Sequence, residues 1–566
     1  MDPETLIQVK NLSVDFKAEG ENVCAVNNIS FGIKKGSILG IVGESGSGKS
    51  VTALSMLQLV QEPGRISSGQ ILFREDNGKE TDLAALKTRA IRRFRGNHLS
   101  MIFQEPMSSL NPVYKCGKQV SEAMLAHKKK GRADARKRSI ELFRELKLPR
   151  PEKVYEQYPH ELSGGQKQRV MIAMAMACQP SLLIADEPTT ALDVSVQKSI
   201  LQSLKELREK HKMSILFITH DLGIIAEIAD EVLIMYKGEI VEKGPTEKVF
   251  RQPEHPYTRG LLACRPRLDT DLKRLPTVAD FMNRDERYLE KLLKEKQAKK
   301  DYSGVEDLLT THDLSTFFKL KTGIFQAADI VKAVDRVNLN LKKGETLGLV
   351  GESGCGKTSL GRTILQLVDA TAGEVFFRDI LLTGLNNSQM RKIRKKIQII
   401  FQDPYSSLNP RISIGSAIRE PMKVFGLHKN EKARKKRTLE LLERVGLERS
   451  HYNRYPHEFS GGQRQRISIA RALAVEPEFI VCDESVSALD VSIQAQILNL
   501  LNDLKDEFGF SYIFISHDLS VVKYMSDRIA VMKDGKILEC GPAEEIYYHP
   551  KEEYTRKLID AVPAFV

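Results

Sequence analysis

The segment Gly43-Glu-Ser-Gly-Ser-Gly-Lys-Ser50 decides the fold, because it has the residues and spacing of a Walker A phosphate-binding loop. The apolar run Ile38–Val42 before it predicts a buried parallel strand, and the run that starts at Val51 predicts a helix. A glycine-rich turn in this position points backbone N–H groups at a phosphate, above the positive end of the helix dipole. Lys49 adds a positive charge, and Ser50 offers a hydroxyl group to Mg²⁺.

A second copy of this loop, Gly351-Glu-Ser-Gly-Cys-Gly-Lys-Thr358, shows that the chain is a tandem repeat. The two lysines are 308 residues apart (357 − 49). Tyr158-Pro-His-Glu-Leu-Ser-Gly-Gly-Gln166 also returns, as Tyr455–Gln463, at an offset of 297 (460 − 163). The difference predicts about ten extra residues in the first half, around Glu75 to Thr81.

Composition places the chain among ordinary globular proteins and excludes several classes. It has 566 residues, of which 41% are hydrophobic and 28% charged. Because no apolar run approaches a membrane span and the first residues do not form a signal peptide, we expect a cytosolic location. Seven scattered cysteines without a Cys-x-x-Cys pair favour reduced thiols over disulfides or zinc. The net charge of +12 is compatible with nucleic acid, anionic lipid or solvated helix faces, and the last reading is favoured because aromatics are not interleaved with the basic runs.

Each half predicts an α/β fold with a parallel core. Continuous apolar runs such as Leu182–Ala185 are typical of strands covered on both faces, whereas Ile7 to Phe16 alternates like an antiparallel strand. The stretch from Asn111 to Ser163 predicts a helical subdomain. We therefore expect two tandem P-loop domains, residues 1–264 and 306–566. They are joined by a charged linker, residues 265–305, with a solvated helix between Arg284 and Lys300.

Paired acidic residues follow an apolar strand in each half. Asp186 and Asp483 are candidates to anchor Mg²⁺, and Glu187 and Glu484 to orient and deprotonate a water molecule. An isolated acidic pair at a strand end is usually solvated, but each pair here lies downstream of a phosphate loop and is followed by Ala-Leu-Asp. The combination predicts nucleotide hydrolysis.

The turns Ser163-Gly-Gly-Gln166 and Ser460-Gly-Gly-Gln463 precede helices rich in basic residues. In that position each turn predicts a second anion-binding helix start, suited to a γ-phosphate. With these motifs the chain resembles the ATP-binding cassette (ABC) ATPases, over nearly everything except the linker.

The resemblance implies ATP and Mg²⁺ as cofactors and a RecA-like core, an antiparallel β subdomain and a helical subdomain in each domain. It also implies head-to-tail packing of the domains, with each nucleotide between one Walker loop and the other domain's Ser-Gly-Gly-Gln turn. The resemblance gives His220 and His517 as switch histidines and Gln104 and Gln402 as Mg²⁺-contacting glutamines. Phe16 and Phe318 match the ring that stacks on adenine, although strand core is an almost equally good reading. The implied ATP-binding residues are Gly43, Glu44, Ser45, Gly46, Ser47, Gly48, Lys49, Ser50, Ser163, Gly164, Gly165 and Gln166, and in the second half Gly351, Glu352, Ser353, Gly354, Cys355, Gly356, Lys357, Thr358, Ser460, Gly461, Gly462 and Gln463.

The two halves depart little from the family pattern. Ser485 stands where the first half has Pro188, and Phe459 where it has Leu162, and neither change removes a functional group. We therefore expect both sites to hydrolyse ATP. Cys355 lies near a helix N-terminus, which predicts a lowered thiol pKa and sensitivity to thiol reagents.

Within the family, the closing segments His255-Pro-Tyr-Thr-Arg259 and His549–Arg556 resemble those of the oligopeptide, dipeptide and nickel importers. Such proteins lie at the cytoplasmic face of the inner membrane and dock on two permeases, while a separate extracytoplasmic protein binds the cargo. ATP closure would pull on the regions Gln104 to Pro112 and Gln402 to Pro410. Peptide is the expected cargo, with nickel and glutathione open. The alternative is a soluble ABC protein acting on the ribosome or nucleic acid; it is disfavoured, because the chain lacks sustained heptads and a long helical arm, so no nucleic-acid partner is expected.

Overall fold

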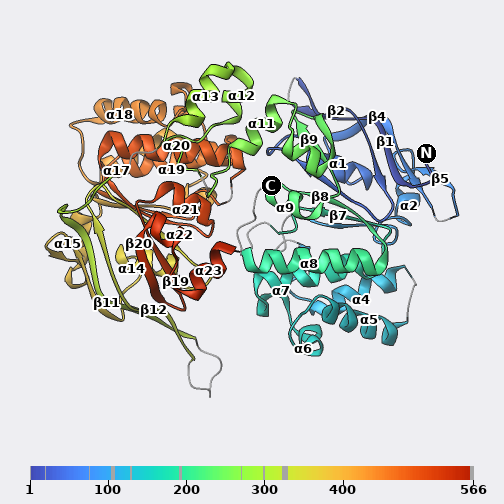
Figure 1. Ribbon diagram of the computed structural model, residues 1–566, viewed down its shortest axis with the longest axis horizontal. Helices are drawn as coiled ribbons and strands as arrows, with labels where there is room; N and C mark the ends of the chain where they lie inside the picture. Colours follow the sequence, from blue (N-terminus) through green and yellow to red (C-terminus); the bar gives the residue numbers. More distant parts are fainter. Residues whose placement is uncertain are drawn as a thin grey trace. The chain divides into compact units, whose positions relative to one another are not determined.

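A computed structural model describes residues 2–18, 21–75, 77–103, 109–127, 131–189, 194–268, 270–296, 300–320, 329–487 and 489–560 (Figure 1). The chain divides into two compact units, Met1–Leu262 and Ala263–Val562. The segment expected to be a linker therefore belongs to the second unit. The domain limits at residues 264 and 306 stay predictions.

The centre of the first unit is a six-stranded sheet in the order β10-β9-β3-β8-β7-β6. Its neighbours are parallel except for the β9–β10 hairpin. Every residue of β3, β7 and β8 is buried, as the continuous apolar runs predict for strands covered on both faces. The strands are β3 (Ile38–Val42), β6 (Leu99–Ile102), β7 (Leu182–Asp186), β8 (Ser214–Ile218), β9 (Glu231–Tyr236) and β10 (Glu239–Pro245).

A second, antiparallel sheet has the order β2-β1-β4-β5. One apolar cluster joins it to the central sheet, with Val9 and Ile71 from the antiparallel sheet and Ile41 and Ile184 from the central one. Helix α1, which follows the Walker loop, contributes Ala53 to the same cluster. The antiparallel strands are β1 (Thr5–Ala18), β2 (Glu21–Lys34), β4 (Gly64–Arg74) and β5 (Glu80–Asp82).

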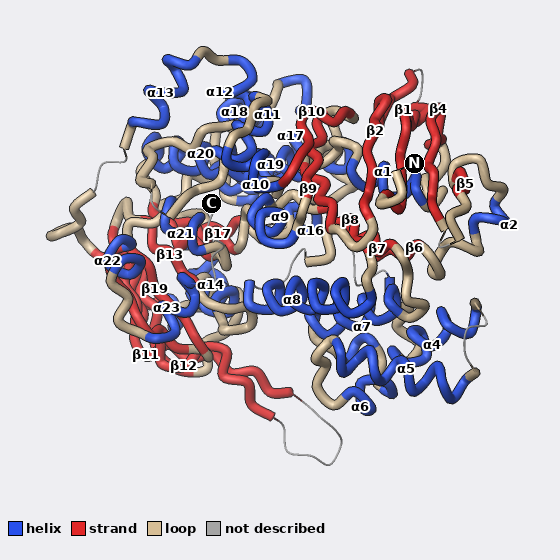
Figure 2. The backbone as a smooth tube through the Cα atoms, turned by 45° about the vertical axis from the view of Figure 1, so that its right-hand side comes forward, coloured by secondary structure: helices blue, strands red, loops and turns tan. Residues whose placement is uncertain are grey.

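The helical subdomain predicted between Asn111 and Ser163 is present, and its helices lie together near the bottom of Figure 2. The helices of the first unit are α1 (Lys49–Met56), α2 (Thr88–Ile91), α4 (Cys116–Ala126), α5 (Arg132–Glu145), α6 (Pro151–Glu156), η1 (Pro159–Glu161), α7 (Gly164–Met176), α8 (Val194–His211), α9 (Leu222–Ile228), α10 (Thr246–Arg251) and α11 (Pro256–Ala263).

The second unit repeats this architecture. Its sheets have the orders β16-β17-β18-β13-β19-β20 and β12-β11-β14-β15. The strands are β11 (Asp307–Leu320), β12 (Asp329–Lys342), β13 (Thr346–Val350), β14 (Ala372–Phe377), β15 (Ile380–Leu381), β16 (Ile397–Ile400), β17 (Phe479–Asp483), β18 (Ser511–Ile515), β19 (Arg528–Lys533) and β20 (Lys536–Pro542). The helices are α12 (Val278–Asn283), α13 (Glu286–Lys294), α14 (Lys357–Ile364), η2 (Leu382–Gly384), α15 (Asn387–Ile393), α16 (Pro404–Ser407), α17 (Ile414–Val424), α18 (Glu431–Arg444), η3 (Arg449–Asn453), η4 (Pro456–Glu458), α19 (Gly461–Leu473), α20 (Val491–Phe508), α21 (Leu519–Met525), α22 (Ala543–Tyr548) and α23 (Glu553–Asp560).

The extra residues of the first half are not in one place, which corrects the sequence-based expectation. Phe73 pairs with β1 as Phe377 pairs with β11, an offset of 304 (377 − 73). Asp82 and Leu381 then occupy matching positions in the next strands, an offset of 299 (381 − 82). Counted from the Walker lysines, the first half therefore has four more residues between Lys49 and Phe73 and five more in the β4–β5 hairpin. The prediction of one insertion around Glu75 to Thr81 is wrong in part.

The segment before the second cassette packs on that cassette. Asn499 of α20, only 3% exposed, accepts from the Leu275 N–H at 2.9 Å and donates to the Leu275 carbonyl oxygen at 2.8 Å. Lys523 donates to the carbonyl of Leu268, and Arg274 forms an ion pair with Asp503. The first cassette has Gln202 and Ala226 at the positions that correspond to Asn499 and Lys523 at the offset of 297, so this receiving surface is specific to the second half.

The helix expected between Arg284 and Lys300 is α13, and it is amphipathic rather than wholly solvated. Its residues Leu289 and Leu292 are buried, whereas its charged residues face water. Asp285 caps it by accepting from the N–H of Tyr288 at 2.8 Å. The segment is therefore an ordered part of the second unit.

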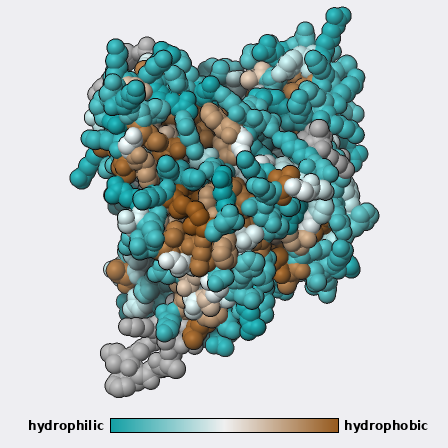
Figure 3. Space-filling model, turned by 90° about the vertical axis from the view of Figure 1, so that its left-hand side faces the viewer, coloured by the Kyte–Doolittle hydropathy of each residue, from teal (hydrophilic) through white to brown (hydrophobic). Residues whose placement is uncertain are grey.

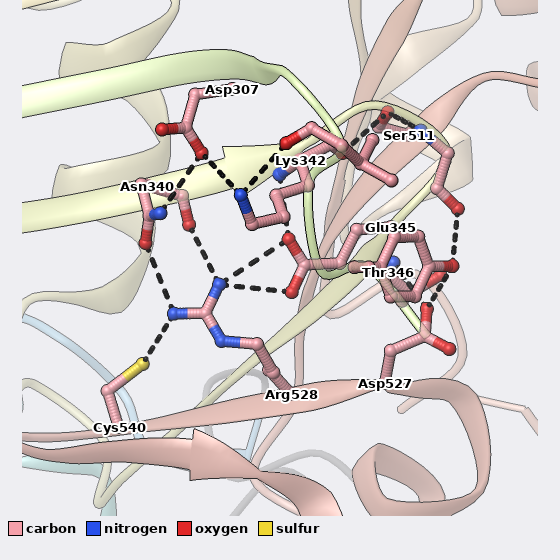
Figure 4. Close-up of polar contacts among 12 residues, drawn as sticks. Asp307, Asn340, Lys342, Glu345, Thr346, Ser511, Asp527, Arg528 and Cys540 are labelled. Atoms are coloured by element: carbon pink, nitrogen blue, oxygen red, sulfur yellow. Dashed lines mark hydrogen bonds and ion pairs between the residues drawn. The ribbon is translucent and has the colours of Figure 1, made fainter. Parts of the chain in front are cut away.

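A polar network ties the two sheets of the second unit together, at the end of the central sheet away from the Walker loop (Figure 4). Glu345, with no exposed surface, accepts from Arg528 at 3.1 Å, and Arg528 also donates to the Asn340 side chain of β12 at 3.1 Å. Burial raises the pKa of Glu345 even beside Arg528. At the corresponding place in the first unit, the simpler pair Lys34–Glu231 joins β2 to β9.

We expect Asn499→Ala to lower the free energy of unfolding of the second unit by about 1–3 kcal/mol, because it leaves the buried backbone groups of Leu275 unpaired. Calorimetric unfolding of the whole chain measures this. The matched control is Gln202→Ala on the exposed equivalent surface, with an expected change within about 0.5 kcal/mol. Equal effects of the two substitutions would contradict a stabilising role of the Asn499–Leu275 hydrogen bonds.

Candidate nucleotide-binding site

The Walker loop of each unit starts where a buried strand of the central sheet ends. After β3 the chain passes so close to β9 that a Cβ atom on Gly43 would lie 2.2 Å from the carbonyl oxygen of Met235. Gly48 has a φ of +97°, and a Cβ atom added to it would lie 2.5 Å from the carbonyl oxygen of Ala25. Both positions require glycine, and they fix the path of the loop into α1.

The Walker lysine of each unit is held by its own loop. Lys49 Nζ donates to the carbonyl oxygens of Gly43 and Glu44, both at 2.8 Å. Lys357 Nζ does the same with Gly351 at 2.7 Å and Glu352 at 2.9 Å. Because both lysine residues are buried, these carbonyl groups compensate a charge that is otherwise costly to bury.

A hydroxyl and a carboxylate lie together beside each lysine. Ser50 Oγ donates to Asp186 Oδ1 at 3.1 Å, and Thr358 Oγ1 donates to Asp483 Oδ1 at 2.8 Å. Burial raises the pKa of Asp186 to about 6, against the hydrogen bond from Ser50, and it also raises the pKa of Asp483. Hydroxyl and carboxylate oxygens are ligands that Mg²⁺ accepts, and a cation would relieve the cost of the buried carboxylate, so this pair fits Mg²⁺.

The glutamate after each aspartate faces a histidine. Glu187 and Glu484 have φ values of 48° and 46°, an unusual left-handed conformation for glutamate. Glu187 Oε1 lies 3.1 Å from His220 Nδ1, and Glu484 Oε2 lies 3.7 Å from His517 Nδ1. Strained backbone that the surroundings enforce is typical of functional positions.

In the second unit a glutamine completes this group. Gln402 Nε2 donates to Glu484 Oε2 at 2.7 Å. The hydrogen bond with His517 lowers the pKa of Glu484. Burial by itself lowers the pKa of His517, but the hydrogen bond and charge of Glu484 outweigh it, so the pKa of His517 is raised. Glu484 is therefore held as a carboxylate, the form that can accept a proton.

The Ser-Gly-Gly-Gln turns lie at the starts of α7 and α19. Ser163 Oγ accepts from the N–H of Gln166 at 3.4 Å, and the Gln166 side chain accepts from the N–H of Ser163 at 3.1 Å. Ser460 and Gln463 form the same capping box. Each turn thus presents a capped helix N-terminus, as predicted. Gln104 and the Ala-Leu-Asp segment at residues 191–193 lie outside the described residues.

The two phenylalanines considered for adenine stacking differ. Phe16 is half-buried and packs against the apolar cluster of the first unit. Phe318 is 40% exposed. The exposed ring is available to a ligand, whereas the half-buried ring also serves the core.

The sequence-based reading assigned no role to the tyrosines of the closing segments, although both halves carry them. Tyr257 Oη accepts from the backbone N–H of Glu44 at 3.0 Å, and Tyr554 Oη accepts from that of Glu352 at 3.1 Å. The signal was the repeat of Tyr-Thr-Arg at the same offset as the other late motifs, 297 (554 − 257).

The expectation of an activated Cys355 thiol is wrong. The side chain is buried, with 7% of the residue exposed, and burial raises the thiol pKa more than Lys357 lowers it. The helix N-terminus is near, but desolvation dominates.

Strand ends that gather a phosphate loop, an acidic pair and a histidine define a P-loop nucleotide-binding protein with two cassettes. A sequence profile of the ABC transporter family matches residues 26–190 and 334–487, and one for the "oligopeptide/dipeptide transporter, C-terminal region" matches residues 241–288 and 538–566. The chain belongs to the ABC transporter family and is an ABC ATPase.

Similar full-length proteins are named glutathione import ATP-binding protein GsiA. The chain is 46% identical to that of Pectobacterium atrosepticum over 560 residues, covering 99% of this chain and 89% of the relative. It is also 46% identical to that of Salmonella typhimurium over 568 residues, covering 100% of this chain and 90% of the relative. The GsiA protein of Escherichia coli O157:H7 is 46% identical over 565 residues, with the same shares covered.

Two solved cassettes are also similar in sequence. A dimeric, post-hydrolysis structure of the ATP-binding cassette MJ0796 with ADP and Pi is 32% identical and covers 42% of this chain and 98% of that one, with a TM-score of 0.38. The structure of cbiO1 from Clostridium perfringens is 26% identical and covers 46% and 97%, also with a TM-score of 0.38. Among the described residues, no helix has the length and apolar character needed to span a membrane.

We expect Cys355 of the native, nucleotide-free protein to react with iodoacetamide more slowly than the exposed Cys24. Peptide mass spectrometry after timed labelling at pH 7.5 measures the two rates. Labelling in denaturant, where both thiols are solvated, is the control and should equalise them. Faster modification of Cys355 in the native protein would show that its thiol is activated after all.

Proposed function

We propose that the chain is the ATP-hydrolysing subunit of an importer, working at the cytoplasmic face of the inner membrane. The observation that carries the proposal is that one end of each central sheet gathers a buried Walker lysine, a hydroxyl–aspartate pair and a glutamate beside a histidine. These residues can bind a nucleoside triphosphate and activate a water molecule. The matches to the transporter family and to its oligopeptide C-terminal region connect the activity to uptake.

Each side chain of the set has a separate task in the proposed reaction. Lys49 and Lys357 leave their carbonyl partners and bind phosphate oxygens. Ser50 and Asp186, with Gln104, would hold Mg²⁺ in the first cassette, and Thr358, Asp483 and Gln402 would hold it in the second. When bound, Mg²⁺ neutralises the charge that develops on the phosphates.

Glu187 and Glu484 accept the proton of the attacking water in the proposed mechanism. Each glutamate has a left-handed backbone conformation, and its carboxylate lies beside the histidine that follows the neighbouring strand. His220 and His517 orient that carboxylate and contact the γ-phosphate. The lowered pKa of Glu484 keeps the base ionised before the reaction.

We propose that the two units pack head to tail around two nucleotides. Residues 43–50 would then face residues 460–463, and residues 351–358 would face residues 163–166. What supports this is the form of the Ser-Gly-Gly-Gln turns, because a capped helix start that presents N–H groups and a hydroxyl suits a phosphate. Ring stacking on adenine by Phe16 and Phe318 belongs to the same proposal.

The proposed partners are two permease subunits, each docking beside one glutamine loop. Exposed apolar side chains occur within an otherwise hydrophilic face of the molecule (Figure 3). In the sequence next to Gln104, the apolar side chains of Phe103, Val113 and Tyr114 are exposed, Val113 to 72%. Tyr405 is the exposed aromatic side chain beside Gln402. An apolar patch of this kind suits a docking helix.

The proposed cargo is a small peptide, and glutathione is the first peptide to test, because the relatives are named for glutathione import. An extracytoplasmic binding protein would deliver it to the permeases. Nickel import stays a second candidate through the importer branch. A soluble ABC protein that acts on the ribosome or nucleic acid is the alternative class.

We expect the double variant Glu187→Gln with Glu484→Gln to lose ATP turnover by at least about a hundredfold, because removal of a general base costs 10²–10⁴-fold. The variant should still bind ATP, since the phosphate loops are unchanged. Phosphate release and filter binding of labelled ATP measure the two properties. Turnover near the original rate would overturn the assignment of the glutamates.

A transport assay tests the cargo. Cells that lack glutathione and peptide uptake are supplied with this chain, its permeases and its binding protein, and the uptake of labelled glutathione, a dipeptide and nickel is compared. Glutathione or peptide uptake that the double glutamine variant abolishes is the expected result. Co-sedimentation with ribosomes, and no association with membranes, would overturn the importer proposal.

A further inference from the structure

The closing helix of each cassette touches the phosphate loop through one hydroxyl group. Tyr257 on α11 accepts from the N–H of Glu44, and Tyr554 on α23 accepts from the N–H of Glu352. Glu44 and Glu352 are the second residues of the two Walker segments. The contact occurs in both units at equivalent positions, so it is not an accident of one packing arrangement.

The peptide groups on either side of the second Walker residue are both fixed. Glu44 donates its N–H to Tyr257 and offers its carbonyl oxygen to Lys49. Glu352 is held in the same way between Tyr554 and Lys357. The tyrosine hydroxyl and the lysine therefore bind the N–H and the carbonyl oxygen of the same residue. The hydroxyl group restrains the part of the loop from which the lysine must reach the phosphates.

Each tyrosine helix is in turn anchored to a hairpin of its central sheet. The carboxylate of Glu242 on β10 accepts from the backbone N–H groups of Glu254 and His255 at 3.0 and 3.1 Å, just before α11. In the second unit, Glu539 on β20 accepts from the N–H groups of Lys551 and Glu552 at 2.9 and 3.3 Å. A carboxylate that caps the start of a helix fixes its position and its direction.

The surroundings of the two rings differ, although the contact is the same. Tyr257 has no exposed surface, and its ring lies 4.3 Å from that of Tyr236. Tyr554 is half-buried, with Lys533 Nζ 4.8 Å from its ring centre. Burial raises the pKa of Tyr554 to about 12, so its hydroxyl group stays neutral at physiological pH. The shared feature of the two sites is thus the hydroxyl group on the Walker amide.

We propose that Tyr257 and Tyr554 are positioning residues for nucleotide binding: each hydroxyl holds the entry of its Walker loop in the conformation that receives the phosphates. The regions that match the oligopeptide transporter C-terminal profile, residues 241–288 and 538–566, then contribute to nucleotide binding. The inference rests on ATP binding by the cassettes and does not depend on the cargo, on the permeases or on the assignment of the glutamates.

The test is the double variant Tyr257→Phe with Tyr554→Phe, which removes two oxygen atoms and keeps both rings. Loss of one hydrogen bond of ordinary strength at each loop predicts an increase of about three- to tenfold in the Kd for ATP. The KM for ATP should rise by the same factor, while kcat at saturating ATP stays within about twofold, since no reacting group is altered. Each single variant should weaken one of the two sites. Titration calorimetry gives the Kd, and it is suitable because the chain has no tryptophan to report binding by fluorescence.

Tyr236→Phe is the matched control. It removes the hydroxyl group of the tyrosine whose ring packs against Tyr257. The hydroxyl group that accepts from the Glu44 N–H belongs to Tyr257 and is kept. We expect its Kd and KM to equal those of the unmodified protein. An unchanged Kd in the double variant, a loss confined to kcat, or an equal loss in Tyr236→Phe would overturn the proposal. Failure of the importer proposal would leave the ATP affinities as predicted, so the two results are separable.

Discussion

Each phosphate loop has to compensate the charge of a buried lysine ammonium group when no nucleotide is bound, and the rest of the site is arranged around this requirement. Lys49 and Lys357 are buried, and each is stabilised by two carbonyl oxygens of its own loop. This arrangement works only if the loop bends tightly, which the close approach of Gly43 to β9 and the left-handed Gly48 enforce. Because parallel strands end at the same edge of the sheet, the acidic pair after β7 and the histidine after β8 come to the same place.

Much of this arrangement could be predicted from the sequence, and the exceptions have physical reasons. The Walker loops, the Asp-Glu pairs and the histidines are local motifs at strand ends, so their neighbourhood follows from the parallel sheet. The activation of Cys355 was wrongly predicted, because proximity to a helix N-terminus is visible in a sequence whereas burial is not. Tyr257 was missed for a related reason, since its partner is a backbone amide more than two hundred residues away, and a backbone amide carries no sequence signal. The spacing of the motifs alone suggests one insertion in the first half. The strand registers show extra residues in two places, between the Walker loop and Phe73 and in the β4–β5 hairpin.

The two halves are alike at the phosphate loops and different around them. The Arg362 guanidinium group lies 3.8 Å from the Asp483 carboxylate. The residue of the first half that corresponds to Arg362 is Leu54. The second half also contains the ion pair between the buried Glu345 and the partly exposed Arg528, at the other end of its central sheet. Because Glu345 is buried, its charge depends on the contact with Arg528. Arg362 therefore adds a positive charge near the aspartate of the second site, where the first half has an apolar side chain.

The segment that follows α11 has a consequence for the order of the two cassettes. Its contacts with Asn499 and Lys523 use side chains for which the first half has Gln202 and Ala226. The two copies therefore differ at this surface, and the copy at the carboxyl end binds the connecting segment. A chain with the two cassettes in the opposite order would keep the site residues but would place Gln202 and Ala226 where these contacts are made.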